Sequence, residues 1–170
     1  WHDNREGLRL FVPILKTTPS WHQSDEYKAL MVSLPPLPEG IAKARRDLRG
    51  IMLIDADLAG ANLSRADLAG ADLDSADLAN ADLKGTDLSD IFLEGANLFR
   101  AIVEGANLQR AKLATANLSH ARLSHANLQE VNLESANLQE AHLWHANLAH
   151  ANLGGANLCG AYLREANMSS

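Results

Sequence analysis

The chain contains seven histidines, whose side chains have the widest choice of chemistry in this sequence. Five of them lie close together in the second half of the chain: His120, His125, His142, His145 and His150. Neutral imidazole is a common zinc ligand, so two histidines at a suitable spacing could form a surface metal site. The alternative, which we favour, is that each histidine simply neighbours an acidic or basic side chain. We therefore predict no metal site and no cofactor.

Serine, histidine and aspartate are abundant, but no combination of them indicates an enzyme. The sequence has no glycine-rich loop and no strained elbow that would present a nucleophile. The single cysteine, Cys159, excludes an intrachain disulfide framework, and no neighbouring feature would activate its thiol. A concave pocket beside the first repeats would be needed to revive a catalytic interpretation. No catalytic residue is predicted.

Acidic residues gather in one stretch of an acidic chain whose formal net charge is -6. Residues 51–90 contain nine acids and two bases, whereas residues 91–170 contain six acids and five bases. The candidate acidic patch consists of Asp57, Asp67, Asp72, Asp77, Asp82 and Asp87. Stacked aspartates could hold calcium, but the change from Asp to Asn further along the chain indicates relief of like-charge repulsion. A carboxylate-rich surface can also imitate the phosphates of DNA.

These side chains are positioned by a five-residue unit that is written 24 times from Ile51 to the end of the chain. Leucine occupies the third place in 22 units, alanine the first place in 20, and Asp or Asn the second place in 17. Leucines five residues apart would spread around a helix, and they would alternate between the two faces of a flat strand. The chain must therefore turn once per unit, and four turns close a square coil of 20 residues.

Stacked coils of this kind predict a right-handed parallel β-helix of six coils. Residues 20 apart should then lie above one another. One inward column reads Ile51, Ala71, Ile91, Ala111, Val131 and Ala151, so that bulky and small side chains alternate as a narrow, filled interior requires. We expect Thr86, the polar residue at an inward alanine place, to bond to local backbone. The same register predicts the charge ladders Arg110-Glu130-His150 and Arg100-His120-Glu140.

The units Ala61-Asn62-Leu63-Ser64-Arg65 and Ala66-Asp67-Leu68-Ala69-Gly70 resemble the pentapeptide-repeat family, and such units cover about 70% of the chain. The resemblance implies an all-β fold, the right-handed quadrilateral β-helix of that family. It leaves the function open, because the family includes DNA-mimicking proteins that protect gyrase, host-targeted effectors and bacterial proteins of unknown role.

Residues 1–50 do not follow the repeat and are predicted to form an N-terminal cap or linker, with residues 51–170 forming the β-helix. Capping-box spacing and an apolar face predict a short helix over 21–34, ended by the prolines from Pro35. An extended piece from Leu8 to Leu15 could pack on the same end or serve as a docking arm. No cap follows the last repeat, so we expect either that the natural chain continues or that two copies pair end to end.

Seven units lack Asp or Asn at the outward second place, and all seven fall on two opposite faces of the predicted coil: Met52, Phe92, Ile102, Lys112, Arg122, His142 and Tyr162. On the other two faces, short Asx side chains can bond to the turn backbone, which indicates a structural role. Exposed aromatic and arginine side chains are typical of contact surfaces. The candidate interaction face contains Ile102, Arg122, His142, Trp144, Tyr162, Phe92 and Phe99.

The sequence thus predicts a non-catalytic scaffold or protein-interaction module with an unknown protein partner. The alternative is an acidic DNA mimic that binds a type II topoisomerase such as gyrase. We do not expect direct nucleic-acid binding, because the repeats are acidic and the main basic cluster is short, from Lys43 to Arg46. With no long apolar run, the chain is expected to be cytoplasmic or the soluble part of a membrane-tethered protein.

Overall fold

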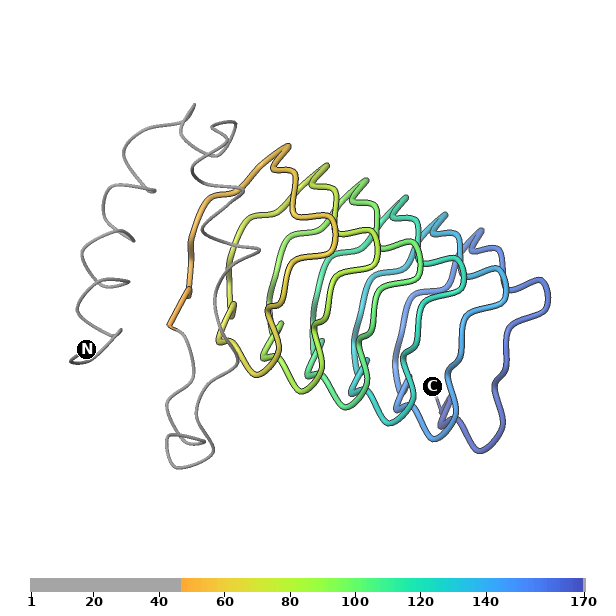
Figure 1. Cartoon of the computed structure of the whole chain (residues 1–170). Helices are drawn as coiled ribbons and strands as arrows, with labels where there is room; N and C mark the ends of the chain where they lie inside the picture. The colour runs from red at the N-terminus through yellow and green to blue at the C-terminus, as the bar shows by residue number, and fades with distance from the viewer. Residues whose placement is uncertain (1–46, 170) are drawn as a thin grey trace.

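The computed structural model describes residues 47–169, which wind into a stack of similar coils (Figure 1). Every β-bridge is parallel and joins residues 20 apart, beginning with Asp47 to Asp67 and ending with Asn147 to Asn167. The predicted register of 20 residues per layer is therefore confirmed. Within residues 47–169, no helix has the length and apolar character needed to cross a bilayer.

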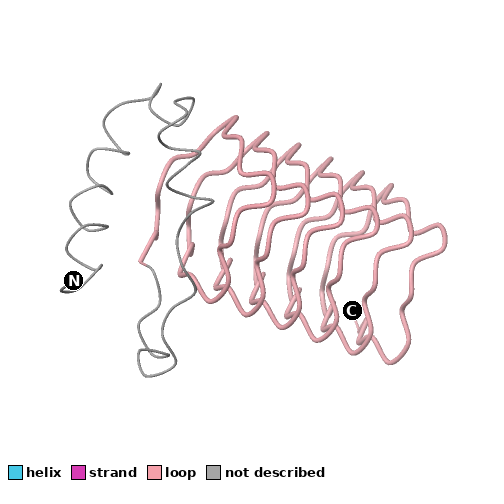
Figure 2. Ribbon diagram, in the orientation of Figure 1, coloured by secondary structure: helices cyan, strands magenta, loops and turns pink. Residues whose placement is uncertain are grey.

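The straight segments are so short that each five-residue unit contributes a single bridging residue, at its second place. No helix and no continuous strand is assigned within residues 47–169, and Figure 2 accordingly draws this whole region as loop. Hydrogen bonds between coils nevertheless recur in every layer. The N–H of Leu98 donates to the carbonyl of Asn117 (2.7 Å), and the N–H of Arg100 donates to that of Ser119 (3.1 Å). These bonds to neighbouring coils satisfy backbone groups that isolated turns would leave open.

Each corner places its fifth residue in the left-handed region of backbone conformation. Eight of these residues are glycines, and the other 16 carry side chains, as at Arg100 (φ 56°) and Thr115 (φ 59°). A left-handed conformation costs an L-residue about 1–2 kcal/mol. A turn hydrogen bond, such as the 3.0 Å bond from the N–H of Ala101 to the carbonyl of Leu98, helps to hold the corner against that cost.

Leucine and alanine line the inside, as predicted. Ile51, Ala71, Ile91 and Ala111 in the alternating column are fully buried. The expectation for Thr86 is wrong in one respect: its hydroxyl donates to the carbonyl of Leu63 (2.8 Å), which lies 23 residues earlier, in the neighbouring coil. The register places Thr86 directly above Ala66, so its hydroxyl lies within hydrogen-bonding distance of the preceding unit of the neighbouring coil.

The two ends of the repeat differ from the middle. The repeat conformation extends N-terminal of the predicted boundary at residue 51, because Asp47 forms a bridge and Leu48 is buried in the core. The predicted cap, with its helix over 21–34, lies outside the described residues. In the last units the inward side chains are partly exposed, and Met168 is 48% exposed. End-to-end pairing through this coil stays a prediction.

The bridging residues form four outward walls, each made of every fourth unit. Wall I carries the bridging residues Met52, Asp72, Phe92, Lys112, Asn132 and Asn152. Wall II carries Asp57, Asp77, Asn97, Asn117, Asn137 and Asn157. Wall III carries Asn62, Asp82, Ile102, Arg122, His142 and Tyr162. Wall IV carries Asp47, Asp67, Asp87, Asn107, Asn127, Asn147 and Asn167. The seven exceptions to the Asx rule from residue 51 onward therefore do fall on walls I and III.

Candidate functional site

The Asx side chains of walls II and IV are bound into ladders along the rod. On wall II, the amide of Asn117 donates to the side-chain oxygen of Asn97 (3.1 Å), and the amide of Asn97 donates to Asp77 (2.9 Å). The same oxygens also accept backbone N–H groups two residues on, as Asn117 does from Ser119 (3.2 Å). Such side chains hold the corners and the stacking of coils, which confirms the structural interpretation of these two walls.

Wall III breaks this ladder in its C-terminal half and presents rings to solvent. Trp144 is 45% exposed and Tyr162 is 47% exposed. The ring of His142 lies beside both, with centroid distances of 4.6 Å to Tyr162 and 6.1 Å to Trp144. Trp144 and Tyr162 stand nearly perpendicular, at 84° and 6.4 Å. The three side chains therefore form one exposed aromatic cluster.

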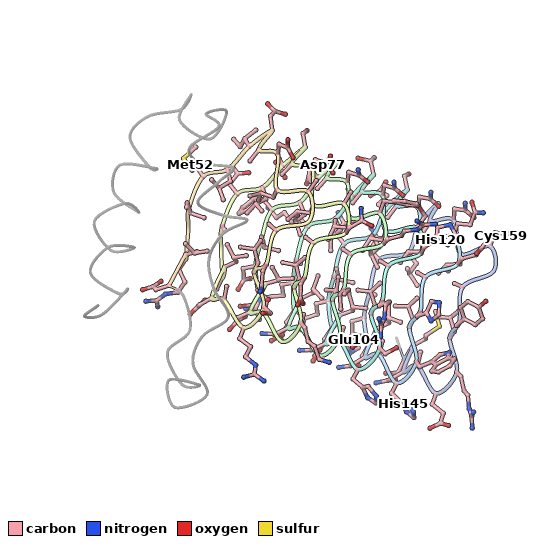
Figure 3. All side chains as sticks on the ribbon, viewed as in Figure 1. Met52, Asp77, Glu104, His120, His145 and Cys159 are labelled. Carbon is pink, nitrogen blue, oxygen red and sulfur yellow. The ribbon has the colours of Figure 1, made fainter. Side chains whose placement is uncertain are left out.

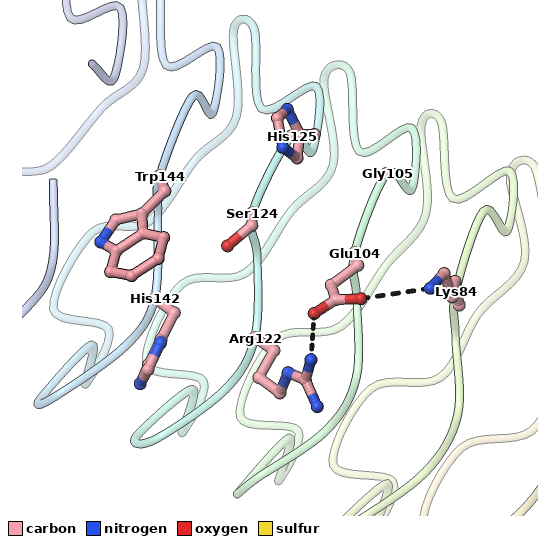
Figure 4. Close-up of a pocket in the computed structure, with 8 residues that line it drawn as sticks. All are labelled: Lys84, Glu104, Gly105, Arg122, Ser124, His125, His142 and Trp144. Carbon is pink, nitrogen blue, oxygen red and sulfur yellow. Dashed lines mark ion pairs between the residues drawn. The ribbon is translucent and has the colours of Figure 1, made fainter. Parts of the chain in front are cut away.

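An ion cluster adjoins these rings toward the N-terminal side. Arg122 Nη2 lies 2.6 Å from one oxygen of Glu104, and Lys84 Nζ lies 3.4 Å from the other. Partial burial opposes the ionisation of Glu104, but the hydrogen bonds and positive charges of Lys84 and Arg122 together outweigh it, so the pKa of this carboxyl lies below its ordinary value. Figure 4 shows Glu104 held between the two cations. Arg122 was predicted to lie on this face, whereas Glu104 and Lys84 were not.

Between the rings and the ion cluster lies an open hollow of about 480 Å³. Its lining consists of Lys84, Glu104, Gly105, Arg122, Ser124, His125, His142 and Trp144 (Figure 4). The hollow exists because two small residues interrupt columns of long side chains: a Cβ added to Gly105 would have no atom within 4 Å, and Ser124 lies one rung above Glu104. It is a surface depression on a rod, open to solvent along one side.

The histidines of wall III and its corner are not arranged as a metal centre. His125 and His145 stack with centroids 4.9 Å apart and planes 8° apart, and His145 Nδ1 lies 3.2 Å from Glu165. Within the described part of the chain, no three His, Cys, Asp or Glu side chains come together as metal ligands would. In Figure 3, His145 and Glu104 lie along the same lower side of the rod.

The predicted charge ladders are confirmed only in part. His120 Nδ1 lies 3.3 Å from Glu140, in agreement with the ladder predicted for wall II. Arg110, by contrast, makes two 2.8 Å hydrogen bonds to Asp90, in the neighbouring coil on the other side from Glu130. The hydrogen bonding to Arg110 lowers the pKa of Asp90. A bidentate geometry explains this choice of partner, because it matches the fork of the guanidinium.

Two residues of the candidate interaction face lie elsewhere. Phe92 belongs to wall I, where Lys112 Nζ sits 4.3 Å from the centre of its ring. Phe99 lies at the corner that follows wall II, where it contacts the ring of His120 edge-on at 5.6 Å. Their unit numbers already assign them to those walls, since Phe99 is the fourth residue of the unit that begins at Ala96. The contiguous candidate site is therefore confined to wall III.

The six aspartates of the acidic patch form a belt around the rod. Their walls differ: Asp72 lies on wall I, Asp57 and Asp77 on wall II, Asp82 on wall III, and Asp67 and Asp87 on wall IV. Each of them also accepts a hydrogen bond from the backbone N–H two residues on. These carboxylates therefore stabilise corners as well as carrying charge.

Charge is distributed unequally among the four walls. In the described units of wall III, four basic residues face three acidic ones: Arg65, Lys84, Arg122 and Arg164 against Asp82, Glu104 and Glu165. Acids outnumber bases by five to one on wall I, by three to one on wall II and by five to two on wall IV, counted over residues 47–169. Within residues 47–169, wall III is thus the one wall on which bases outnumber acids, by a single charge.

Comparison with known proteins identifies the family. The family model described as pentapeptide repeats matches residues 52–90, 76–114, 116–153 and 145–170. Among solved structures, the pentapeptide repeat protein Rfr23 from the cyanobacterium Cyanothece 51142 is 40% identical, with 57% of this chain and 63% of that chain covered and a TM-score of 0.40. HetL from Nostoc sp. strain PCC 7120, which is involved in heterocyst differentiation regulation, is 39% identical over 72% of this chain and 61% of that chain, with a TM-score of 0.29.

QnrB1, a plasmid-mediated fluoroquinolone resistance protein, is 18% identical, covering 69% of this chain and 70% of that chain with a TM-score of 0.41. The present chain spans about three fifths of the length of Rfr23 and of HetL. No curated protein matches its sequence. The family match extends over most of the chain and agrees with the coil of 20 residues, the buried leucines and the Asn ladders. The chain belongs to the pentapeptide repeat family.

Proposed function

We propose that this protein is a non-catalytic interaction module and that wall III binds a partner protein. The observation that carries the proposal is the exposed cluster of Trp144, His142 and Tyr162 beside Arg122, on a rod whose walls II and IV are bound into Asx ladders. Aromatic and arginine side chains dominate the energetics of protein interfaces. A stiff stack of coils holds these side chains in place before binding, which lowers the entropic cost of association.

The two exposed rings are large enough to contribute substantially to binding. Full burial of an aromatic side chain removes about 150–250 Å² from water. Trp144 and Tyr162 are each a little under half exposed, so roughly 100 Å² of each ring is still available. At about 25 cal/mol per Å², burying that area would contribute about 2–3 kcal/mol for each ring. Loss of both rings should therefore weaken an interaction severely.

The experiment compares tagged versions of this chain as baits in cells of an organism that carries the gene. The double variant Trp144→Ala/Tyr162→Ala tests wall III, and Phe92→Ala/Lys112→Ala is the matched control on wall I. We expect partners retained by the wild type and by the control to be lost by the wall III variant. We also expect the thermal midpoint of the wall III variant to stay close to that of the wild type. Equal retention by both variants, or a large loss of stability in the wall III variant, would contradict the proposal.

The second candidate function is an acidic DNA mimic that binds a type II topoisomerase such as gyrase. It is favoured by the excess of acids in residues 51–90, including the belt of Asp57, Asp67, Asp72, Asp77, Asp82 and Asp87. A gyrase supercoiling assay, with and without a quinolone, separates the two functions. Inhibition or protection by the full chain would support the mimic, whereas no effect at a large excess of the chain would reject it.

We further infer that residues 51–170 form six coils of a right-handed quadrilateral β-helix and that the N-terminal residues form a partly helical cap. The strict repeat of five residues and the register of 20 support this architecture. The family to which the chain belongs has the same architecture. A crystal structure of the full chain tests both the coil count and the cap.

A further inference from the structure

We propose that the partner of wall III presents an acidic, extended segment that carries one bulky apolar side chain. This inference rests on the proposed function and specifies the chemistry of the partner. It is carried by the hollow between Trp144 and Glu104 and by the exposed basic side chains of the surrounding wall. Different parts of the segment bind different parts of the wall. The apolar side chain binds in the hollow, and the acidic side chains form ion pairs with the basic residues around it.

The cations of wall III are available to a partner even where they already form ion pairs. The side chain of Arg164 is 81% exposed, that of Lys84 65% and that of Arg122 56%. Glu104, by contrast, is 22% exposed, so the carboxylate lies deeper than the two cations that hold it. A guanidinium has five N–H donors, and Glu104 lies within 4 Å of Arg122 through Nη2. A carboxylate from outside can therefore join this cluster without displacing Glu104.

The hollow is suited to one apolar or aromatic side chain. Ser124 and Gly105 leave the space, Trp144 and His142 border it toward the C-terminal end, and His125 borders it on the corner side (Figure 4). Rings that line a site favour another ring or an aliphatic group through stacking and apolar contact. Its volume of about 480 Å³ lies within the range of small-ligand pockets, but its open side suits a segment that enters from outside.

Charge complementarity favours a peptide over a nucleic acid. Duplex DNA brings one negative charge for about every 1.7 Å of its length and would extend beyond the few cations of wall III. The neighbouring walls II and IV carry more acids than bases within residues 47–169, and they would repel such a polymer. A short acidic segment brings two or three charges only where the cations lie. The net charge of -6 for the whole chain repels a long polyanion such as duplex DNA more strongly than a segment with two or three charges.

The test begins with selection of a phage-displayed random peptide library on the full chain at neutral pH and low salt. We expect the enriched peptides to contain several Asp or Glu residues and one aromatic or large aliphatic residue. A selected peptide is then synthesised with a fluorescent label, and its affinity is measured by anisotropy. Because its binding has an electrostatic component, the affinity should fall as salt is raised.

Variants then locate the binding site. Trp144→Ala, Arg122→Ala and Arg164→Glu should each weaken peptide binding at least tenfold, whereas the matched wall I variants Phe92→Ala and Lys112→Ala should change it by less than twofold. Circular dichroism and the thermal midpoint of each variant confirm that it is folded. Arg164→Glu is informative even if the ion cluster at Arg122 is disturbed, because Arg164 lies two rungs away from that cluster.

Several results would overturn the proposal. Failure to enrich acidic peptides would do so, as would acidic peptides that bind all five variants equally. Enrichment of neutral or basic peptides that are lost in Trp144→Ala would reject the acidic partner while leaving wall III as a binding surface. A single-stranded oligonucleotide that binds more tightly than the peptides, and is lost in the same variants, would reassign the wall to nucleic acid. Self-association of the chain that is abolished by those variants would reassign it to a second copy.

Discussion

Replacing Asn127 by aspartate would test whether the Asx ladders hold the coils together. The Asn127 amide donates to Asn107 Oδ1 (2.9 Å), and its own side-chain oxygen accepts from Asn147 (3.2 Å) and from the backbone N–H of Gln129 (3.3 Å). The substitution Asn127→Asp keeps both accepted bonds and removes only the donated one. Asn127→Ala removes all three. Comparing the two substitutions therefore separates the ladder from the corner.

The expected magnitude follows from these contacts. A net hydrogen bond contributes about 0.5–1.5 kcal/mol, and leaving a partly buried acceptor facing a carboxylate adds a desolvation cost of up to about 1–3 kcal/mol. Since Asn127 is half-buried, we take the lower part of these ranges. We expect Asn127→Asp to lower the free energy of unfolding by about 1–2 kcal/mol, and Asn127→Ala, which loses three bonds, by about 1.5–3 kcal/mol.

The assay is urea unfolding followed by circular dichroism at neutral pH. At that pH the new carboxyl at position 127 is charged and has no proton to donate to the side-chain oxygen of Asn107. It still accepts from Asn147 and from the N–H of Gln129, so Asn127→Asp should be less stable than the wild type and more stable than Asn127→Ala.

Gln139→Glu is the matched control, because it adds a negative charge at an exposed position outside the ladders. It should change the free energy of unfolding by less than about 0.5 kcal/mol. The reasoning would be refuted if Asn127→Asp were as stable as the wild type at neutral pH, or if it were no more stable than Asn127→Ala.

Further predictions concern the core and the ion cluster. Thr86→Val, which removes the hydroxyl donor to the carbonyl of Leu63, should cost about 0.5–1.5 kcal/mol in urea unfolding, and a cost near zero would mean that this bond is replaceable. Leu98→Ala should cost about 2–5 kcal/mol because Leu98 is fully buried, whereas a cost near that of a surface substitution would contradict a close-packed interior. The pKa of Glu104 is lowered on folding, so its contribution is present above the ordinary glutamate pKa and is lost as the pH falls through the folded value. Glu104→Gln should therefore be less stable than the wild type at neutral pH and approach it below about pH 4, as measured by thermal midpoints across that range.

Much of the fold follows from the repeat alone. A period of five suits neither a continuous helix nor a flat strand, so four units must close a layer. The parallel β-bridges, each between residues 20 positions apart, confirm this. The buried column from Ile51 and the Asn ladders follow from the same arithmetic. These features could be predicted because each depends on which residues share a column.

Other features depend on the directions of individual side chains. Arg110 could reach Asp90 or Glu130 from the same column, and the register does not choose between them. The hollow beside Trp144 arises from small residues in two different columns, at Gly105 and Ser124, and only their positions in space reveal it. The left-handed corners also escaped prediction, because 16 of the 24 fifth-place residues that adopt them are not glycine.

The central claim is that a partner protein contacts wall III. It is tested most directly by placing a photo-activatable amino acid at single outward positions of the full chain in living cells. We expect covalent adducts with one partner from positions 142 and 162 on wall III, and none from positions 112 and 132 on wall I. Adducts of equal yield from both walls, or from wall I alone, would contradict the claim.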